Sequence, residues 1–449
     1  MMDPNFDLPL PRSIIAPSYS DDDLVTRLYL ENEYLRSQRK TFSVGPGIEL
    51  PSEAILESEV RFCFTRQFLR ETSKQEMGHR HLVIANEYPS KEKRYANGFV
   101  HRRVKFYQEA GLDVDVVAFG KRVRPDVYDF DGVKVLAGYV NELSGLISAR
   151  DYTSVSVHFP NSEMWKVLKD NIPDSTNLIF YIHGYEARNW SRLPYGIRDV
   201  AMLNARIERS LRTEDVWKEI VNSNVDRFVF VSNWWRDAAM DDLGVLFDGS
   251  NSEVVHNFID TRLFSYEEKD PQQRFKLLWV RSANAHNYGA DIAAEFLRQL
   301  KRTSVWSDLE ILIVGDGQYF SEFDEFQNEP EVTVRRDFLR QEEIADLHKQ
   351  FGMFIVPTRF DTQGVSRDEA MSSGLVPITC PVTAVPEFAD NSCSILFAED
   401  NVESAVEQYL RVAEDPELFS AMSRAAAERS AALNGAEATV MREIALMKR

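Results

Sequence analysis

The segment at residues 357–371 reads PTRFDTQGVSRDEAM and follows a short apolar run. The glycine at position 364 lets the backbone turn and approach a ligand closely. The residues after it form a predicted helix that ends at Gly374, and its N-terminus would present unpaired N–H groups to a diphosphate. Asp361 and Glu369 are carboxylates that can accept hydrogen bonds from sugar hydroxyls. The segment therefore indicates a site for a phosphorylated polyol; the alternative is a helix-capping Asp361 and a solvated Glu369.

Outward from this segment, short apolar runs alternate with stretches of helical periodicity. Alternation of this kind predicts parallel sheets covered by helices on both faces. The pattern restarts after Asp270-Pro271, so we predict an α/β protein with two doubly wound units. Ligands of such sheets bind at the carboxyl ends of the strands, and the cleft between two units is the natural site. The predicted strands are 81–85, 114–119, 133–136, 154–158, 178–182, 227–231, 277–280, 310–314, 332–334, 353–356, 376–379 and 394–396.

Composition excludes several classes of protein. The chain has 449 residues with 28 Phe, 16 Tyr and 7 Trp, which is ample material for packed cores and excludes disorder for its bulk. A net charge of −19 argues against binding to nucleic-acid backbones. No run approaches the ~18 apolar residues of a membrane span, and the first residues do not resemble a secretory signal. With only three cysteines, a cytoplasmic location is expected.

The charge is unevenly distributed. Residues 91–124 hold nine Lys/Arg against four Asp/Glu, whereas residues 361–449 hold seven against fifteen. The basic stretch 91–124 is either a solvated helix face or a surface that docks on anionic lipid or on a lipid diphosphate acceptor. The second reading would give peripheral contact with the inner face of the membrane.

The segment 357–371 resembles the E-x7-E signature of retaining GT-B glycosyltransferases of family GT4, with Asp361 in the first Glu position and Glu369 in the second. Further sequence motifs of the family occur in the family's order between residues 255 and 397, and weaker similarity extends back to His81. They are VHNFID (255–260, family PNGVD), VGDG (314–317, VG-x-G), DFL (337–339, F-L/G-x), EAMSSGLVP (369–377, EAMA-x-G-x-P) and VPE (385–387, G-x-P-E).

The resemblance implies a GT-B fold, in which two Rossmann-like domains face a cleft. We predict that residues 1–75 form a partly helical N-terminal extension packed on the body, with an oligomerisation or acceptor-docking arm as the alternative. Residues 76–262 would bind the acceptor and residues 263–430 the nucleotide sugar. The C-terminal helix at 431–449 would cross back to the first domain. Whether the chain forms a homo-oligomer is left open.

The family's donor-binding residues map onto this chain one by one. Glu369 would hydrogen-bond the nucleotide ribose, and Phe338 lies where the family contacts the nucleobase. The donor sugar hydroxyls would be held by Asp361 together with backbone groups of Gln363, Gly364 and Val365.

One position departs from the family pattern. The family binds the diphosphate with an Arg and a Lys in a G-R-L-x-x-x-K-G loop, which here reads VRSANAHNYG (280–289). Arg281 fits the Arg, but Tyr288 occupies the Lys position, which removes one fixed positive charge from the leaving group. His286 is a candidate for compensation, and a surface histidine is the alternative.

In the first domain, His183 at a predicted strand end resembles the family's histidine that faces the donor sugar, and a core histidine at a strand end is the alternative. Arg281, Asp361 and His183 are the predicted catalytic residues. His158 ends the preceding strand and is a weaker candidate on the acceptor side. Asn97-Gly98 occupies the place of the family's acceptor loop. Two D-x-D motifs occur, at 113–115 and 129–131. The first lies at the start of a predicted strand and the second in a predicted hairpin turn, so we predict no metal site.

The implied activity is transfer of a hexosyl group from a nucleoside-diphosphate sugar to a glycan or lipid-linked acceptor with retention of configuration. The nucleotide sugar is the substrate, and no cofactor is expected. Synthesis of cell-surface polysaccharide or glycoconjugate is the expected setting. Two alternatives remain open: an inactive pseudo-glycosyltransferase that serves as a binding or partner subunit, motivated by Tyr288, and a sugar-nucleotide epimerase on the same fold.

Overall fold

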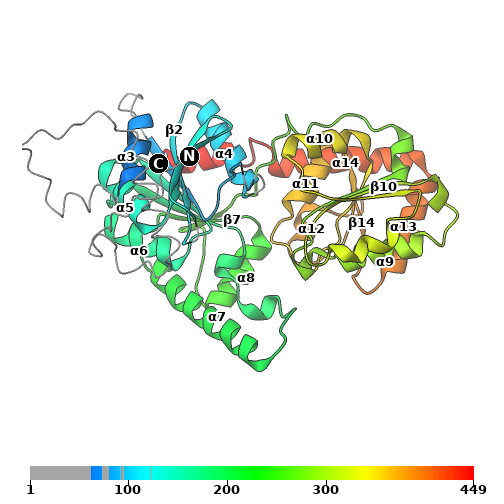
Figure 1. The fold of residues 1–449 in the computed structure, drawn as a ribbon, viewed down its shortest axis with the longest axis horizontal. Coiled ribbons are helices and arrows are strands. Elements are labelled where there is room, and N and C mark those ends of the chain that lie inside the picture. The colour runs from blue at the N-terminus through cyan, green and yellow to red at the C-terminus, as the bar shows by residue number, and fades with distance from the viewer. Residues whose placement is uncertain (1–61, 73–79, 92, 94–95, 122) are drawn as a thin grey trace, which may run out of the picture.

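The computed structural model describes residues 62–449 except 73–79, 92, 94–95 and 122. Two α/β domains lie side by side, each with a mainly parallel sheet between layers of helices (Figure 1). The predicted fold class of two doubly wound domains is confirmed. Of the predicted extension at 1–75, only residues 62–72 are described, and they hold helix α3 (Cys63–Glu71), which packs against α5.

The first domain is built on an eight-stranded sheet in the order β3-β4-β2-β1-β5-β6-β7-β8. The order runs outward from β1 in both directions, so the topological switch point lies between β1 and β5. Its strands are β1 (Arg80–Ala85), β2 (Asp113–Phe119), β3 (Asp126–Phe130), β4 (Val133–Gly138), β5 (Ser154–His158), β6 (Asn177–Ile182), β7 (Arg227–Phe230) and β8 (Ser252–Val254). Its further helices are α4 (Gly98–Glu109), α5 (Val140–Ala149), α6 (Ser162–Asn171), α7 (Val200–Val221) and α8 (Asn233–Leu243).

Two strands of this sheet were not predicted, and both are edge strands. β3 pairs only with β4, in antiparallel register, and its side chains are half exposed, while β8 has three residues. Short and polar edge strands lack the continuous apolar run that marks a buried parallel strand.

The second domain has a six-stranded, fully parallel sheet in the order β11-β10-β9-β12-β13-β14, so its switch point lies between β9 and β12. Its strands are β9 (Lys276–Val280), β10 (Glu310–Gly315), β11 (Val332–Arg336), β12 (Met353–Ile355), β13 (Val376–Thr379) and β14 (Ile395–Leu396). Its helices are α9 (Ala290–Leu300), α10 (Gln341–Gln350), α11 (Val365–Ser372), α12 (Val385–Phe388), α13 (Val402–Glu414) and α14 (Pro416–Asn434). Both the loop that begins at Arg281 and the segment 357–364 leave the sheet at this switch point.

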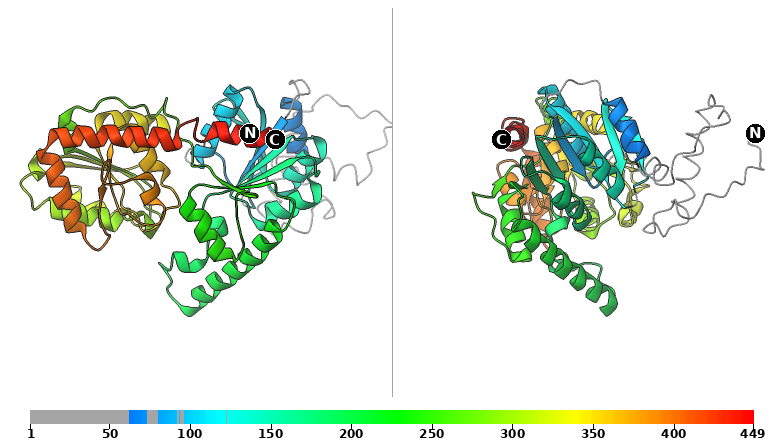
Figure 2. Two further views of the ribbon diagram at one scale, coloured as in Figure 1. Left: turned by 180° about the vertical axis from the view of Figure 1, so that it is seen from behind. Right: turned by 90° about the vertical axis from the view of Figure 1, so that its left-hand side faces the viewer.

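The chain passes between the domains twice. The first passage lies between β8 and β9, and the second follows α14, after which helix α15 (Val440–Met447) packs on α4, β5 and β6 of the first domain. Figure 2 shows α14 and α15 as consecutive red helices, one on each domain. No helix in the described part of the chain is both long and apolar enough to cross a membrane.

Candidate active site

A cavity of about 460 Å³ opens at the carboxyl ends of β9 and β12. Because parallel strands deliver their following loops to one edge of the sheet, residues far apart in sequence meet here. The cavity is lined by five of the predicted donor-binding residues, which are Arg281, Phe338, Asp361, Val365 and Glu369. The switch point of the second domain is therefore the candidate donor site.

Arg281 is held from three sides at the end of β9. Its Nη2 lies 3.3 Å from Asp361 Oδ2, and its Nη1 donates to the carbonyl of Pro357 over 3.3 Å. Its Cζ lies 4.5 Å from the ring centroid of Tyr288. Burial lowers the pKa of Arg281 and the charge of Asp361 opposes that shift, but a guanidinium stays protonated in proteins. The arrangement presents a fixed cation to the cavity.

The loop before α11 is shaped for close approach of a ligand. Gly364 has a φ of +105° and precedes the helix without any side-chain cap, so the amides of the first turn are not covered by a capping side chain. Thr383 fixes the loop, since its hydroxyl donates to the Asp361 carbonyl over 2.6 Å and accepts from the Asp361 amide over 3.0 Å. Asp361 and Val365 thus stand at the helix end that favours an anion.

Glu369 lies one turn into α11 and is 8% exposed. Its Oε1 accepts a hydrogen bond from Gln341 Nε2 over 3.2 Å. Burial and the neighbouring charge of Asp368 raise the pKa of Glu369 to about 8. Without a ligand, this carboxyl is therefore mostly protonated at neutral pH. Phe338 lines the same cavity and is 50% exposed, so its side chain presents an aromatic surface against which a planar group can pack.

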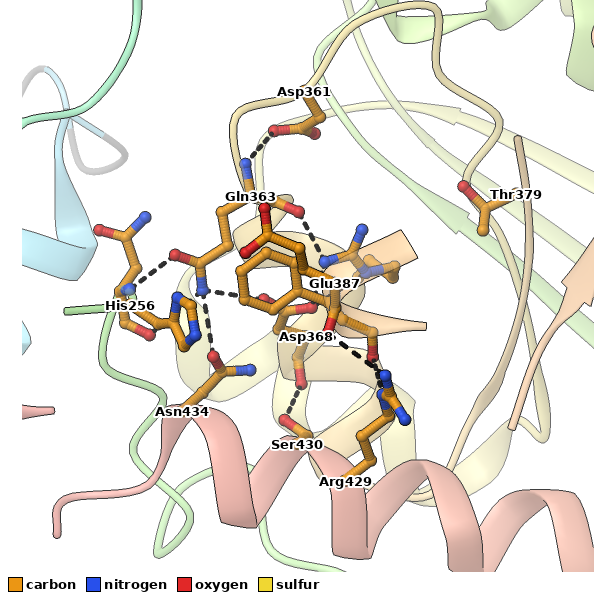
Figure 3. A network of polar contacts seen from close by, with 12 residues as sticks. His256, Asp361, Gln363, Asp368, Thr379, Glu387, Arg429, Ser430 and Asn434 are labelled. Atoms are coloured by element: carbon orange, nitrogen blue, oxygen red, sulfur yellow. Dashed lines mark hydrogen bonds and ion pairs between the residues drawn. The ribbon is translucent and has the colours of Figure 1, made fainter. Parts of the chain in front are cut away.

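Gln363 is not among the residues that line the donor cavity, and its side chain points toward Asn434 (Figure 3). It is 1% exposed; its Oε1 accepts from the amide of Asn257 and its Nε2 donates to Asp368 Oδ2 and Asn434 Oδ1 over 2.9 and 3.2 Å. These bonds join the donor loop to both passages between the domains. Only the Gln363 backbone faces the site, with its amide donating to Asp361 Oδ1 over 3.2 Å.

The two predicted site histidines of the first domain, His158 and His183, lie at the ends of β5 and β6 as expected, but both side chains are buried. His158 is fully buried, with its ring stacked on Tyr181. His183 is 7% exposed, and its Nε2 lies 3.0 Å from His158 Nδ1. Burial is the main cause that holds the pKa of both histidines well below the usual value. The charge of Arg103 lowers the pKa of His183 further, and the charge of His183 lowers that of His158 further. Neither histidine is among the residues that line the donor cavity, and the acceptor role of His158 and the catalytic role of His183 stay predictions.

The Asn97-Gly98 loop lies at the cleft, opposite α10 of the second domain. Asn97 adopts a left-handed conformation with a φ of 50°, and its Nδ2 donates to Asn86 Oδ1 and the Glu87 carbonyl. A side chain at Gly98 would meet the Gln341 amide group at 3.5 Å. Gly98 lines a cavity of about 630 Å³ that shares Glu369 with the donor cavity.

Contacts across the cleft involve residues that the sequence did not indicate. The Thr362 hydroxyl donates to the His183 carbonyl over 2.6 Å. The Glu387 carboxylate accepts from the amides of Asn233 and Trp234, at the N-terminus of α8 in the other domain, over 3.0 and 2.6 Å. Such partners come from opposite domains, so no local sequence pattern marks them.

Two cations of the basic stretch 91–124 form contacts within the protein. Arg103 is buried, with its Nε 2.9 Å from Glu443 Oε1 of α15. Arg102 reaches across the cleft, where its Nε donates to Gln341 Oε1 over 2.8 Å and its Nη2 to Glu342 over 2.6 Å. Two of the nine cations therefore serve the fold and the cleft, which weakens the expectation of a membrane-docking face.

Two family models match the chain. The model described as Glycosyltransferase Family 4 matches residues 65–263, and the model described as Glycosyl transferases group 1 matches residues 274–415. Each match covers one domain, and the boundary between them falls in the first passage between the domains. No curated protein sequence matches the chain.

Many solved structures share the fold. A sucrose-phosphate synthase from Thermosynechococcus elongatus has a TM-score of 0.62 at 15% identity, covering 82% of this chain and 98% of its own. A glycosyltransferase from Rickettsia africae has a TM-score of 0.59 at 11% identity, covering 83% and 98%. HepE of Anabaena, in complex with UDP and glucose, has a TM-score of 0.57 at 12% identity, covering 82% and 98%. At such identities the likeness concerns the fold.

Proposed function

Because the chain belongs to the GT-B glycosyltransferases of the family-4 type, we propose that it transfers a hexosyl group from a nucleoside-diphosphate sugar to a glycan or lipid-linked acceptor, with retention of configuration. The observation that supports the donor class is the single cavity that unites Arg281, the N-terminus of α11 and Glu369. These groups suit a diphosphate and a ribose, and HepE was solved with UDP. Synthesis of cell-surface polysaccharide or glycoconjugate is the proposed setting.

The proposed reaction needs charge stabilisation at the leaving diphosphate. Arg281 and the first-turn amides of α11 would hold the charge that develops as the bond between the sugar carbon and the diphosphate oxygen breaks. The acceptor hydroxyl forms the new bond on the same face of the sugar, and its proton passes to the departing diphosphate. In this route the positive charge comes from the protein, and neither a metal nor a cofactor is proposed. The contacts of Thr362 and Glu387 across the cleft would exclude water from the reacting groups.

A pseudo-glycosyltransferase is the second candidate, and Tyr288 is the observation that favours it. A tyrosine in place of the family's lysine leaves Arg281 as the side-chain cation of the loop that lines the donor cavity. Such a protein would bind a nucleotide sugar and not turn it over.

The test is a thermal-shift screen with UDP-, GDP-, ADP- and dTDP-sugars, since a ligand that binds the native state raises its melting temperature. We expect one nucleotide to stabilise the protein and Glu369→Ala to abolish that shift. An unchanged shift in Glu369→Ala would refute the placement of the ribose. Transfer assays with the binding nucleotide sugar then separate the candidates, because binding without transfer or hydrolysis identifies the pseudo-enzyme. The anomeric configuration of the product reports retention, and a new sugar nucleotide formed without acceptor would identify an epimerase.

A further inference from the structure

A second cavity, of about 590 Å³, adjoins the donor cavity. One wall comes from the first domain, from the segment 185–198 and the first half of α7, which projects from the body of the domain (Figures 1 and 2). The other wall is the loop 284–287 that follows β9, together with Gln318 and Tyr319. Asn284 lines both cavities, so the second cavity lies next to the diphosphate end of the candidate donor site.

The lining of this cavity is strongly basic. Four arginines line it, and the lining contains no Asp or Glu among the described residues; the four are Arg188, Arg198, Arg206 and Arg209. In the described part of the chain, none of them forms an ion pair with a carboxylate, and Arg206 donates only to the carbonyls of Leu193 and Tyr195. By contrast, the nearby Arg192 pairs with Asp242. Although the chain has a net charge of −19, the described residues supply no carboxylate partner to these four guanidinium groups around one cavity.

Arg188 and Arg206 are half-buried, and Arg188 also contacts the second domain. Its Cζ lies 5.2 Å from the ring centroid of Phe360, in the second domain directly before Asp361. Burial lowers the pKa of Arg188 even though Glu186 opposes the shift. A partly desolvated cation is costly unless an anion compensates it, and a bound phosphate would supply that compensation with two parallel hydrogen bonds.

Aromatic side chains complete the cavity. They are Tyr185, Trp190, Tyr195 and Tyr319. The Tyr195 ring lies 5.1 Å from the ring of His286, so this contact connects the two domains along the edge of the cavity. Aromatic walls with a few charged groups suit a ligand that has one apolar face and one anionic group, which describes a sugar phosphate.

We propose that this cavity is the acceptor site and that it recognises a sugar bearing a phosphate group, which narrows the proposed lipid-linked acceptor to one whose sugar is joined to phosphate. The inference rests on the proposed function, because it assigns the neighbouring cavity to the nucleotide-sugar donor. The arginines hold the phosphate, the aromatic rings pack against the sugar, and the hydroxyl to be glycosylated points past Asn284 toward the donor.

The test compares two arginines inside the cavity with one outside it. Arg209 lies on α7, and Arg198 precedes that helix. Neither forms an ion pair with a carboxylate among the residues that the structure describes, so Arg209→Gln and Arg198→Gln disrupt no ion pair in that part of the chain. Arg212→Gln is the matched control, since Arg212 lies on α7, is 70% exposed in its side chain and is not in the lining. Binding of inorganic phosphate and of a panel of hexose monophosphates is measured by calorimetry, with the unphosphorylated hexoses as neutral probes.

We expect the wild-type protein to bind phosphate and at least one hexose monophosphate more tightly than the parent hexose. Arg209→Gln and Arg198→Gln should each raise that dissociation constant by about tenfold, the loss expected for one charged hydrogen-bonding partner, while Arg212→Gln leaves it unchanged. Nucleotide binding should be the same in all variants. Three results overturn the proposal: no binding of any phosphorylated probe at millimolar concentration, an equal loss in Arg212→Gln, or loss of nucleotide rather than of hexose-phosphate affinity. If no nucleotide binds while the hexose phosphate still does, the proposed function fails and the anion site stands.

Discussion

The guanidinium of Arg281 lies 4.5 Å from the ring centroid of Tyr288, at the position where related glycosyltransferases have a lysine. The tyrosine does not replace the missing charge, but its ring faces the remaining cation. A ring in this position attracts a guanidinium by about 0.5–2 kcal/mol and holds it in one orientation. Tyr288 is therefore a positioning residue for the cation that we place at the diphosphate.

The first prediction concerns this ring. Tyr288→Ala should raise the KM for the nucleotide sugar about 2- to 30-fold, the factor that corresponds to the lost cation–ring attraction. Tyr288→Phe keeps the ring and should behave like the wild type. Steady-state kinetics with the donor identified by thermal shift provides the measurement. If the phenylalanine variant were as impaired as the alanine variant, the hydroxyl and not the ring would be the functional part of Tyr288.

A second prediction concerns closure of the cleft. The Glu387 carboxylate caps two amides of α8 from the opposite domain, and such a cap contributes about 1–2 kcal/mol. Glu387→Ala should lower the ratio of molecules with a closed cleft to those with an open cleft about 5- to 30-fold. Small-angle scattering of the nucleotide-bound protein would detect this change as a larger radius of gyration.

Ser232→Ala is the control for Glu387→Ala, because Ser232 caps the same helix through the Trp235 amide from within its own domain. It should lower thermal stability and leave nucleotide-induced compaction intact. Equal compaction in the wild type and Glu387→Ala would show that Glu387 does not hold the cleft closed.

The fold was predictable because each buried parallel strand is a continuous apolar run between polar loops. The run at 277–280 is LLWV, and the structure extends it by one residue into β9. The donor residues Arg281, Asp361 and Glu369 were predicted from the family resemblance, and the structure brings the three to one cavity because the segments that carry them follow neighbouring strands.

The remaining parts of the site depend on packing between distant segments. His183 follows its strand as predicted, but stacking with Phe159 and contact with His158 turn its ring into the core. Gln341 reaches Glu369 from another helix, and Glu387 reaches α8 from another domain. Sequence spacing contains no information on such pairs, because their distance is set only when the elements of one domain pack together or, for Glu387, when the two domains dock.

The third prediction concerns the buried ion pair between α4 and α15. Arg103 and Glu443 are 1% and 0% exposed in their side chains, and Tyr107 also donates to Glu443. Glu443→Gln leaves the buried Arg103 charge uncompensated and should cost about 3–5 kcal/mol of the free energy of unfolding, measured by urea titration. The double variant Arg103→Met/Glu443→Leu should recover most of that loss, because apolar groups of similar volume need no partner. A Glu443→Gln protein as stable as the wild type would mean that the pair does not fasten α15 to the first domain.

The last prediction uses the titration of Glu369. Its pKa is raised to about 8 in the folded protein, against 4.5 as the ordinary value. Between these two pH values the folded protein holds a proton that the unfolded chain has lost, so this group makes the free energy of unfolding fall as pH rises, by about 1.4 kcal/mol per unit. Glu369→Gln is neutral at every pH and lacks this slope. The variant should match the wild type near pH 4.5 and become progressively more stable than it toward pH 8, as measured by denaturant titration across that range.

The difference between Glu369→Gln and the wild type isolates Glu369, because Glu186, whose pKa burial raises to about 7, titrates in both proteins. A stability difference that stays constant with pH would mean that Glu369 is already ionised in the fold. The same proton links the site to its ligand. A ribose diol donates hydrogen bonds and so favours the ionised carboxylate, and nucleotide affinity of the wild type should therefore rise as pH approaches 8, with proton release on binding. Glu369→Gln should bind nucleotide weakly and show no such rise.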